Sequence, residues 1–448
     1  MRGNLDSSIR DFHEQYGEVV RYSPDELSFA SEEAWKDIYH QKHPLEKDPA
    51  FYSFTKLGRD GAQSIFSAKD AAHARIRKAM SHAFSEKALR EQEPFLKQYV
   101  DLLVEKLRGV AASKSSVDMV EWYNYTTFDI IGDLAIGRSF GCLNDSKYHS
   151  WVHGIVNLFK LGPIIKTVHI YHLAPLLRLL APKKLRDNRQ RHEQYVVENV
   201  QERLSKGFLR DRPDFLSYIL RSKGTPEELN DHEIEANANF LLLAGSETTG
   251  TALAGTTYYL LKTPEAFTIV VEEVRKAFET EDEINFLNCA ERLPYMQACL
   301  QEGLRIYPPG PVAAPRKTPR DKVTIIGGYE IPAWTGVGVH ALSASHSPSN
   351  FYLPRSFLPE RWLPPAQNDP GSPFRNDKRG ASQPFSLGPR NCLGKSFAYN
   401  EMRVILARLL WNFDLSMEPE SDGWDKQKTY VLWEKGPLMC KLTDIRSD

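Results

Sequence analysis

Residues 385–394 read Phe385-Ser-Leu-Gly388-Pro-Arg390-Asn-Cys392-Leu-Gly394 and lead directly into a helical pattern over Lys395–Leu410. Gly388 and Gly394 permit backbone conformations and close approaches that a β-carbon would obstruct, so a flat ligand can lie against this loop. Cys392 lies just before the helix, where free backbone N–H groups and the helix dipole favour the thiolate, the form of cysteine that binds metals. Arg390 adds a permanent cation that can hold a carboxylate. The stretch therefore predicts a metal-binding cysteine beside an anion-binding arginine.

The chain has 448 residues, of which 41% are hydrophobic and 26% charged, values that are typical of a globular protein and exclude a disordered, collagenous or coiled-coil chain. Its 57 Lys and Arg residues and 58 Asp and Glu residues give a net charge of -1, which argues against a broad basic surface for nucleic acid. The 5 cysteines form no CxxC pair, so neither a disulfide framework nor a zinc site is indicated. We therefore expect a reducing compartment and no nucleic-acid partner.

The pattern along the chain favours one integrated domain over residues 1–448, because no internal repeat, low-complexity tract or Gly/Ser linker divides it. Short β-like runs (EVVRYS, ELSF) occur near the N-terminus, and VTIIGGYEIP at 323–332 predicts a hairpin with a Gly-Gly turn. Helical patterns dominate elsewhere. They cover Ala72–Phe84, Glu86–Leu107, Tyr123–Ile136, Asp187–Lys206, Glu233–Lys262, Pro264–Glu279 and Pro294–Tyr307. The expected fold class is mostly α with minor β.

The sequence leaves open whether the protein contacts a membrane. The chain contains no run of the ~18 apolar residues that a membrane-spanning helix needs, and its first residues lack the apolar core of a signal peptide. It begins abruptly with an amphipathic segment, and we expect a leader to be missing. The segment Trp151–Pro182 is rich in apolar residues and broken by prolines. It is either a lid or membrane-touching surface, or a set of short core helices joined by proline turns.

The pattern over Glu233–Lys262 predicts a helix of roughly 45 Å, long enough to cross the molecule and to be mostly buried. Its middle carries the polar string Ala244-Gly245-Ser246-Glu247-Thr248-Thr249 between apolar stretches. Buried polar groups cost free energy unless they are paired, so this string needs a reason. Either its hydroxyls bond back to helix carbonyls and bend the helix, or the polar groups handle protons.

Two further pairs of polar residues are each one helical turn apart: Glu302 and Arg305 in the pattern ExxR, and His73 and Arg77 in HARIR. Charged pairs at this spacing occur on many solvated helices, where an ion pair contributes only about 0.2–0.5 kcal/mol. Their order along the chain is more specific, because Phe357-Leu-Pro-Glu-Arg361-Trp follows ExxR and precedes the Cys392 loop.

Taken together, these motifs resemble the cytochrome P450 family, whose haem-binding loop FxxGxRxCxG is matched by FSLGPRNCLG at every fixed position. The resemblance covers practically the whole chain. It implies a P450 fold, with a long central helix over a haem and small sheets at its edge. It also implies that Cys392 is the axial thiolate of haem b iron, that Phe385 shields this thiolate, and that Arg390 binds a haem propionate. Gly388 and Gly394 would belong to the same cofactor-binding loop.

The other motifs receive roles by the same resemblance. His73 and Arg77 match a His-x-x-x-Arg pair that contacts the propionates, and Arg316 resembles a further propionate-binding arginine. Glu302, Arg305 and Arg361 are expected to form a structural network of ion pairs rather than to take part in the chemistry.

The string AGSETT resembles the family's oxygen-activation motif AGx(D/E)TT. On that basis Ala244 and Gly245 contact the cofactor, and Gly245 opens a groove for O2. Glu247 and Thr248 are the catalytic pair that relays protons.

The resemblance implies a monooxygenase of fungal microsomal type that acts in secondary metabolism. Electrons would come from NADPH through a separate NADPH-cytochrome P450 reductase, with cytochrome b5 as a second partner, and a basic surface with Arg75, Lys78 and Lys395 would receive the reductase. The native protein is expected to be a monomer at the cytosolic face of the endoplasmic reticulum membrane, so the present chain would be a shortened form. The substrate is expected to be an apolar compound that is hydroxylated, epoxidised, desaturated or oxidatively coupled. The pocket residues expected by family position are Leu243, Ala244, Val312, Ala313 and Val431.

Two other functions compete with this interpretation. A haem-thiolate isomerase or dehydratase would need no O2, and such proteins tend to lose the acid and alcohol pair that Glu247 and Thr248 supply here. A haem sensor or carrier without turnover has no use for a proton relay. Thiolate-specific absorbance of the reduced carbon monoxide complex, and product formation with O2, separate the three.

Overall fold

The computed structural model describes residues 3–41, 44–52, 61–148, 162, 164–168, 170, 171, 173, 183–207, 209 and 212–446. Most of the described residues are helical. The helices are α1 (Leu5–Tyr16), α2 (Glu32–Tyr39), α3 (Asp70–Ser81), α4 (Glu86–Ala112), α5 (Met119–Ile136), α6 (Cys142–Asp145), α9 (Lys183–Ser205), α10 (Phe215–Leu220), α11 (Asp231–Lys262), α12 (Pro264–Ala277), α13 (Phe286–Arg292), α14 (Pro294–Ile306), α15 (Ala341–His346), α16 (Pro364–Asn368) and α17 (Lys395–Asn412).

The strands form small sheets. They are β1 (Val19–Ser23), β2 (Glu26–Phe29), β3 (Glu46–Lys47), β4 (Val117–Asp118), β5 (Arg316–Lys317), β6 (Thr324–Ile326), β7 (Tyr329–Ile331), β8 (Gly336–Val339), β9 (Phe413–Met417), β10 (Lys428–Tyr430), β11 (Leu432–Glu434) and β12 (Met439–Asp444). The largest sheet has the order β1-β2-β8-β5-β3, in which only β2 and β8 run parallel. The others are β4-β12-β9 and the hairpins β6-β7 and β10-β11.

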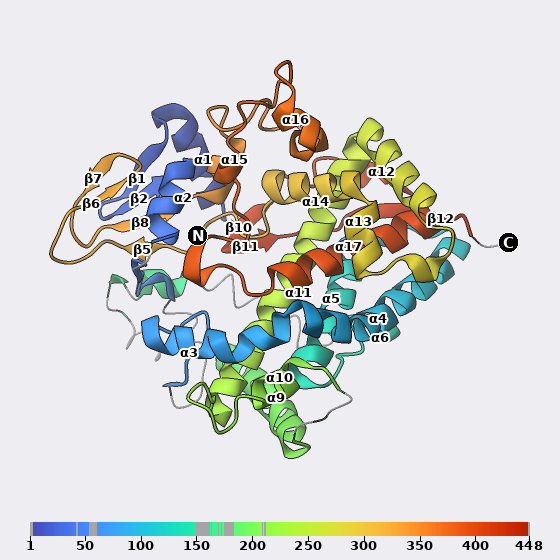
Figure 1. Ribbon diagram of the computed structural model, residues 1–448, viewed down its shortest axis with the longest axis horizontal. Helices are drawn as coiled ribbons and strands as arrows, with labels where there is room; N and C mark the ends of the chain where they lie inside the picture. The colour runs from blue at the N-terminus through green and yellow to red at the C-terminus, as the bar shows by residue number, and fades with distance from the viewer. Residues whose placement is uncertain are drawn as a thin grey trace.

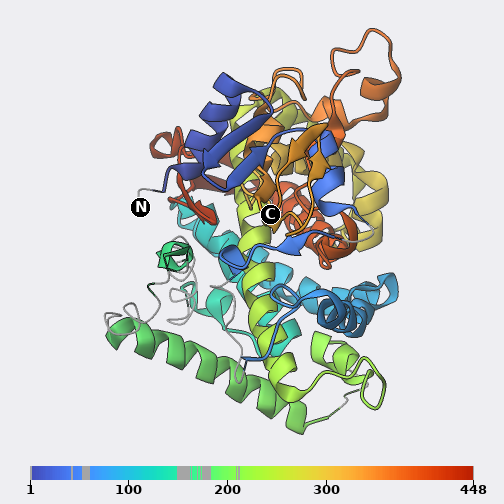
Figure 2. The same ribbon diagram turned by 90° about the vertical axis from the view of Figure 1, so that its left-hand side faces the viewer.

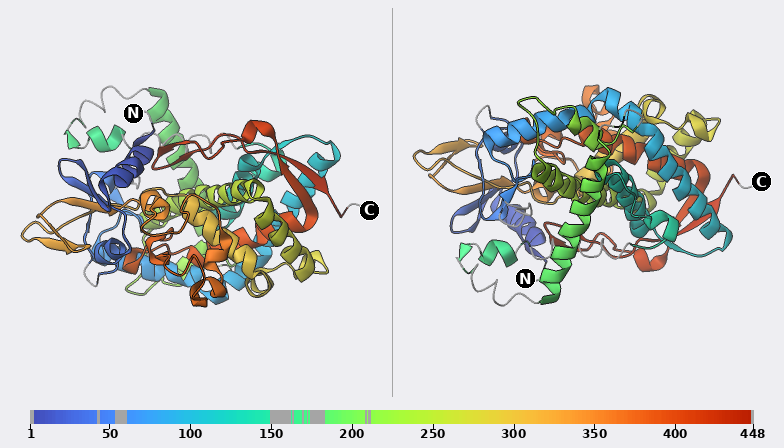
Figure 3. Two further views of the ribbon diagram at one scale, coloured as in Figure 1. Left: turned by 90° about the horizontal axis from the view of Figure 1, so that it is seen from above. Right: turned by 90° about the horizontal axis from the view of Figure 1, so that it is seen from below.

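The largest sheet and the hairpin β6-β7 lie in one half of the molecule, and most of the long helices lie in the other half, together with β12 (Figure 1). Figure 1 shows β1, β2 and β5 to β8 with α1 and α2 on the left, and α4, α12, α13 and α17 on the right. Helix α11 passes through the middle (Figure 2). Helix α9 lies along an outer face, which the view from below shows most clearly (Figure 3). The molecule therefore has a helical body with one sheet-rich edge, as the sequence predicts.

Helix α11 is 32 residues long, which corresponds to about 48 Å. It begins at a capping box, in which Asn230 Oδ1 accepts from the Glu233 N–H (2.9 Å) and Glu233 Oε2 accepts from the Asn230 N–H (3.1 Å). It ends at Lys262, because Pro264 can only start the next helix. Most of its residues are buried, as expected for a helix that crosses the core.

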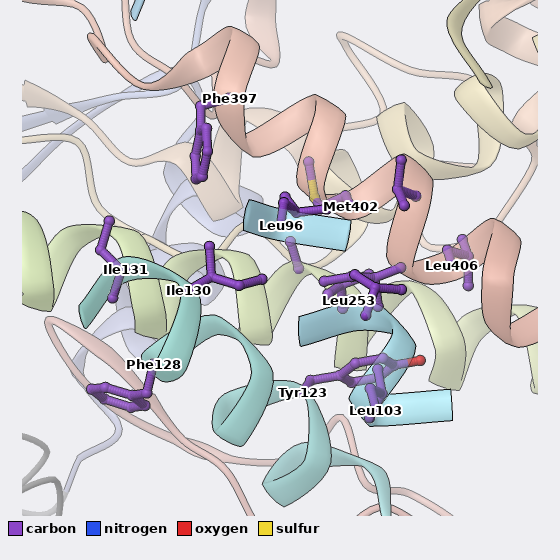
Figure 4. Packing of buried hydrophobic residues seen from close by; sticks show 14 of the residues in the cluster. Leu96, Leu103, Tyr123, Phe128, Ile130, Ile131, Leu253, Phe397, Met402 and Leu406 are labelled. Carbon is purple, nitrogen blue, oxygen red and sulfur yellow. The ribbon is translucent and has the colours of Figure 1, made fainter. Parts of the chain in front are cut away.

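The core around α11 is made by apolar faces of α4, α5 and α17 (Figure 4). The side chains that meet there are fully or almost fully buried, and each stabilises the fold by about 1.5–3 kcal/mol. They include Leu96, Leu103, Tyr123, Phe128, Leu253, Met402 and Leu406. This packing fixes the position of α17, and with it the loop that precedes α17.

The predicted helices and the predicted hairpin are present, with shifts at their ends. Helix α5 starts at Met119, because the Asp118 carboxylate accepts from the Val120 N–H (2.9 Å) and caps it. The turn between β6 and β7 has φ of +56° at Gly327 and +82° at Gly328, which explains the paired glycines. Among the described residues, no helix combines the length and apolar character needed to cross a membrane. Most of Trp151–Pro182 lies outside the described residues, so both interpretations of it stay predictions.

Candidate active site

The Cys392 loop lies between the sheet edge and the start of α17. Gly388 has a φ of +72°, and a β-carbon there would lie 2.1 Å from the Tyr39 carbonyl oxygen, so only glycine fits this turn. The Cys392 N–H donates to the Phe385 carbonyl (2.9 Å), which closes the loop. Gly394 is the N-cap of α17. The predicted position of Cys392 just before a helix is therefore confirmed.

The structure qualifies the predicted ionisation of Cys392. Its side chain reaches accessible surface, but it lies deep in the fold, so burial raises the pKa of the thiol above its ordinary value. The Gly394 N–H and the charges of Arg77 and Lys395 act in the opposite direction but are outweighed. The helix start alone does not produce the thiolate here, whereas a bound metal cation would favour it strongly.

Four predicted anion-binding residues come together beside this loop. His73, on α3, is buried, and Arg77 follows one turn later on the same helix. Arg77 donates through Nη1 to the Asn391 carbonyl (2.8 Å) and through Nη2 to Asn391 Oδ1 (2.7 Å). Arg316, on β5, is 4% exposed and donates to the Tyr52 hydroxyl (2.7 Å). Arg390, in the loop, donates through Nη2 to Asp70 (2.6 Å).

The basic side chains of this cluster lower one another's pKa values, and His73 is left uncharged at neutral pH. Burial first, and then the charges of Lys47, Arg390, Arg77 and Arg316, lower the pKa of His73 to about 4. Burial, with the charge of Arg316 second, also lowers the pKa of Arg390. The positive charges of this cluster outnumber the carboxylates that pair with them among the described residues. Such an excess of positive charge indicates an anion-binding site.

Lys47 belongs to this cluster and was not predicted from the sequence. It is 6% exposed, and its ammonium donates to the backbone carbonyls of Phe66 (2.5 Å) and Ala68 (2.8 Å), just before α3. Burial, followed by the charges of Arg390 and Arg316, lowers its pKa to about 7. Only the pairing of β3 with β5 brings Lys47 to this place, so no local pattern marks it.

The polar string of α11 shows the back-bonded geometry. Ser246 Oγ donates to the Leu242 carbonyl and Thr248 Oγ1 to the Ala244 carbonyl, both at 2.6 Å. A β-carbon at Gly245 would lie 2.6 Å from Ile131 Cδ1, so this glycine allows α5 and α11 to pack closely. Packing is thus the observed reason for the glycine, and the predicted oxygen groove stays a prediction.

Glu247 has a partner that the sequence did not reveal. Its Oε2 accepts from Lys435 Nζ (2.8 Å), and the same ammonium donates to Thr251 Oγ1 (2.6 Å). Both side chains of the ion pair are about 5% exposed. Glu247 and Thr248 are neighbours on α11, but each makes its hydrogen bond to a different part of the molecule.

The predicted structural network is present. Glu302 and Arg305 are fully buried and joined by two hydrogen bonds of 2.8 Å. Arg361 donates to Glu302 Oε1 (3.1 Å) and Trp362 Nε1 donates to Oε2 (2.8 Å). Burial alone would raise the pKa of Glu302, but Arg305 and Arg361 hold it below its ordinary value. Asp377, which was not predicted, forms an ion pair with Arg361.

Three of the five predicted pocket residues line one cavity. Val312, Ala313 and Val431 line a cavity of about 520 Å³, together with residues of α1, the large sheet and the described part of 162–170. Leu243 and Ala244 lie on α11 and do not line this cavity. The expected basic surface is also altered, because Arg75 is paired with Glu233 and Lys78 with Glu227.

A family model described as Cytochrome P450 matches residues 1–442. The chain belongs to the cytochrome P450 family. It is 48% identical over 446 residues to the trichothecene C-4 hydroxylase of Trichoderma arundinaceum, an alignment that covers 99% of this chain and 88% of that protein. It is 46% identical over 444 residues to the cytochrome P450 monooxygenase olcB of Penicillium canescens, with 99% and 89% covered. With the averantin hydroxylase of Dothistroma septosporum it shares 41% identity over 446 residues, with 99% and 82% covered.

Membership in the P450 family makes the protein an oxidoreductase that incorporates oxygen, and it implies haem-thiolate iron. The residues present fit such a group. Arg390 Nη1 is buried without a hydrogen-bond partner among the described residues, beside His73, Arg77 and Arg316, so a carboxylate placed there would satisfy it. Cys392, a free cysteine in the same loop, would supply the sulfur ligand.

Proposed function

We infer that this P450 is a haem-thiolate monooxygenase that hydroxylates an apolar secondary metabolite with electrons from NADPH, delivered by a separate reductase. The observation that carries the proposal is the cluster of the cations Arg77, Arg316 and Arg390, with the His73 imidazole among them, beside the Cys392 loop. It fits the anionic edge of haem b, while Cys392 would hold the iron.

When bound, the haem iron supplies the activated oxygen that is inserted into the substrate. The protein's own residues hold the cofactor and move protons. Phe385 packs against Tyr399, with ring centroids 5.2 Å apart, and would shield the Cys392 sulfur when haem is bound. On α11, the Glu247 carboxylate accepts a proton from solvent. Thr248 Oγ1 keeps its own hydrogen on the Ala244 carbonyl, so its lone pairs are free to accept a hydrogen bond from a proton-carrying water.

Hydroxylation is the favoured reaction, because two of the relatives are named as hydroxylases. Epoxidation, desaturation and oxidative coupling remain outcomes that the same site chemistry allows. The substrates named for those relatives differ, so neither is transferred to this chain. The cavity that contains Val312, Ala313 and Val431 supports an apolar substrate.

The proposed setting is a single catalytic domain that works as a monomer at the cytosolic face of the endoplasmic reticulum membrane, with NADPH-cytochrome P450 reductase and cytochrome b5 as partners. Exposed apolar side chains on α1 and on the nearby described part of 162–173 support membrane contact. They are Leu5, Phe12, Tyr16, Ile164, Ile170, Tyr171 and Leu173.

The test is turnover under labelled oxygen. Protein, reductase and NADPH are incubated with a library of apolar terpenoids and polyketides under 18O2, with Cys392→Ala as the control. We expect one labelled oxygen atom in the product of at least one compound and none with the control. Product that forms equally without O2 would indicate an isomerase or dehydratase. Ligand-induced haem spectra without any product would indicate a sensor or carrier.

A further inference from the structure

A buried ion pair joins the central helix to the C-terminal hairpin. Lys435 follows β11, and its ammonium lies 2.8 Å from Glu247 Oε2 and 2.6 Å from Thr251 Oγ1. The side chains of Lys435 and Glu247 are each about 5% exposed. In the part of the chain that the structure describes, no other cation is paired with this carboxylate. An ion pair this deep in the protein is costly to desolvate, so its charges are coupled strongly to each other.

The chain on both sides of Lys435 is firmly anchored. Trp433 donates through Nε1 to the Pro308 carbonyl (2.8 Å) and stacks on Tyr307, with ring centroids 4.5 Å apart. Trp424 donates to the Gly436 carbonyl (2.8 Å). The ammonium therefore projects from a fixed backbone, and it restrains the Glu247 side chain to one orientation.

The same hairpin lines the cavity of about 520 Å³ described above. The tip residues Thr429, Tyr430 and Val431 line the cavity, whereas Lys435 does not. Val431 has a φ of +79°, a conformation that a β-branched residue rarely adopts. Lys435 therefore acts on α11 and not on the wall of the cavity.

Thr248 and Tyr148 complete the surroundings of Glu247. Thr248 Oγ1 donates to the Ala244 carbonyl and does not bond the carboxylate. Tyr148 lies close enough for the Glu247 charge to add to the effect of burial in raising its pKa, and its hydroxyl accepts from Asn124 Nδ2 (2.9 Å). The restraint on Glu247 thus comes from Lys435 and not from its helix neighbours.

We propose that Lys435 is a positioning residue that holds the Glu247 carboxylate in the orientation from which Glu247 transfers protons. This rests on the proposed monooxygenase function. The ammonium restrains the carboxylate, and a neutral side chain at position 435 would let Glu247 turn to other orientations. Lys435 exchanges no proton itself.

The variants to compare with wild type are Lys435→Met, Lys435→Arg, Glu247→Gln and the double variant Glu247→Gln/Lys435→Met, all as holoenzymes with reductase. Lys428→Met is the matched control, because Lys428 is an exposed lysine on the same hairpin. Product formed per NADPH, hydrogen peroxide release, the solvent deuterium isotope effect on product formation and the substrate-induced haem shift are measured.

We expect Lys435→Met to lower the amount of product formed per NADPH roughly tenfold. A positioned acid or base contributes about 10²–10⁴-fold to a rate, and loss of its orientation should remove only a part of this contribution. The solvent isotope effect should rise, because proton transfer then limits the reaction. Substrate affinity from the haem shift should stay within about twofold, since Lys435 does not line the cavity. Lys435→Arg should restore most of the coupling, and Lys428→Met should behave as wild type.

The decisive comparison is between Glu247→Gln and the double variant. Because Lys435 acts through Glu247, adding Lys435→Met to Glu247→Gln should change the coupling no further. Thermal unfolding of the wild type, Lys435→Met, Glu247→Gln and the double variant should show the same non-additivity. This measurement tests the ion pair without any turnover. The proposal is overturned if the two effects on coupling add, or if Lys435→Met couples normally. Failure of the wild type to form any oxygenated product would instead refute the proposed function.

Discussion

Replacing Glu401 by Gln should stabilise the protein in a strongly pH-dependent way. Glu401 lies on α17, is 1% exposed, and has one carboxyl oxygen, Oε2, without a hydrogen-bond partner among the described residues. Burial raises its pKa from 4.5 to about 8, and a hydrogen bond from Thr249 on α11 offsets only part of this effect. At neutral pH the group is therefore protonated in the folded protein and ionised in the unfolded chain.

The sign and size of the stability change follow from the linkage between proton binding and unfolding. Below pH 4.5 both states hold the proton, so the native state carries no penalty. Between 4.5 and 8 only the unfolded chain ionises, which destabilises the native state by about 1.4 kcal/mol per pH unit. This amounts to about 3 kcal/mol at pH 7 and about 5 kcal/mol above pH 8, where it levels off. A protein of 448 residues unfolds with an entropy of about 0.9 kcal/mol/K, so Glu401→Gln should raise Tm by about 3–4 °C at pH 7.

The assay is thermal and denaturant unfolding of the wild type and Glu401→Gln holoenzymes at pH 4.5, 7 and 8.5. Glu105→Gln serves as the control, because Glu105 is an exposed carboxylate on α4. The stability difference should grow with pH for Glu401→Gln and stay flat for the control. A difference for Glu401→Gln that does not change with pH would refute the reasoning, because it would mean that the buried carboxyl ionises normally.

Three further substitutions test other parts of the molecule. Glu302→Gln leaves two buried guanidinium groups, on Arg305 and Arg361, without their shared carboxylate. The free energy of unfolding should therefore fall by about 3–5 kcal/mol and Tm by about 3–5 °C. An unchanged Tm would contradict the network. Thr248→Ala should fold and bind haem normally but release about tenfold more hydrogen peroxide per NADPH, because the proton path loses a hydroxyl, and unchanged coupling would remove Thr248 from the mechanism. Cys299→Ala should leave haem binding unchanged and cost about 1 kcal/mol, since Cys299 is fully buried and burial raises the pKa of its thiol far above the ordinary value; loss of haem would contradict this.

Local patterns were sufficient to predict much of the fold. Helix α11 was found from its apolar run, and the β6-β7 hairpin from its two glycines. The ends of the helices were harder to predict. Helix α5 starts where the Asp118 carboxylate accepts from the Val120 N–H, a hydrogen bond that forms only in the folded geometry. The Cys392 loop was found because its glycines, its arginine and its cysteine lie within one short stretch.

Residues that reach the site through tertiary contacts could not be predicted in the same way. Lys47 joins the cation cluster only because β3 pairs with β5, and Lys435 meets Glu247 only because the chain after β11 packs against α11. Arg75 and Lys78 were expected on a basic surface that receives the reductase, but they pair with carboxylates more than a hundred residues away in the chain. The predicted thiolate preference of Cys392 had the right local cause, but burial outweighs it.

Absorbance of the reduced carbon monoxide complex tests the central claim, that the sulfur of Cys392 holds the haem iron. Wild type and Cys392→His are purified with haem, reduced and exposed to carbon monoxide. The account predicts that the wild type shows the red-shifted Soret band specific to thiolate ligation and that Cys392→His moves this band to the position of a nitrogen-ligated haem. A wild-type band already at the nitrogen-ligated position, or one that stays unmoved in Cys392→His, would contradict it.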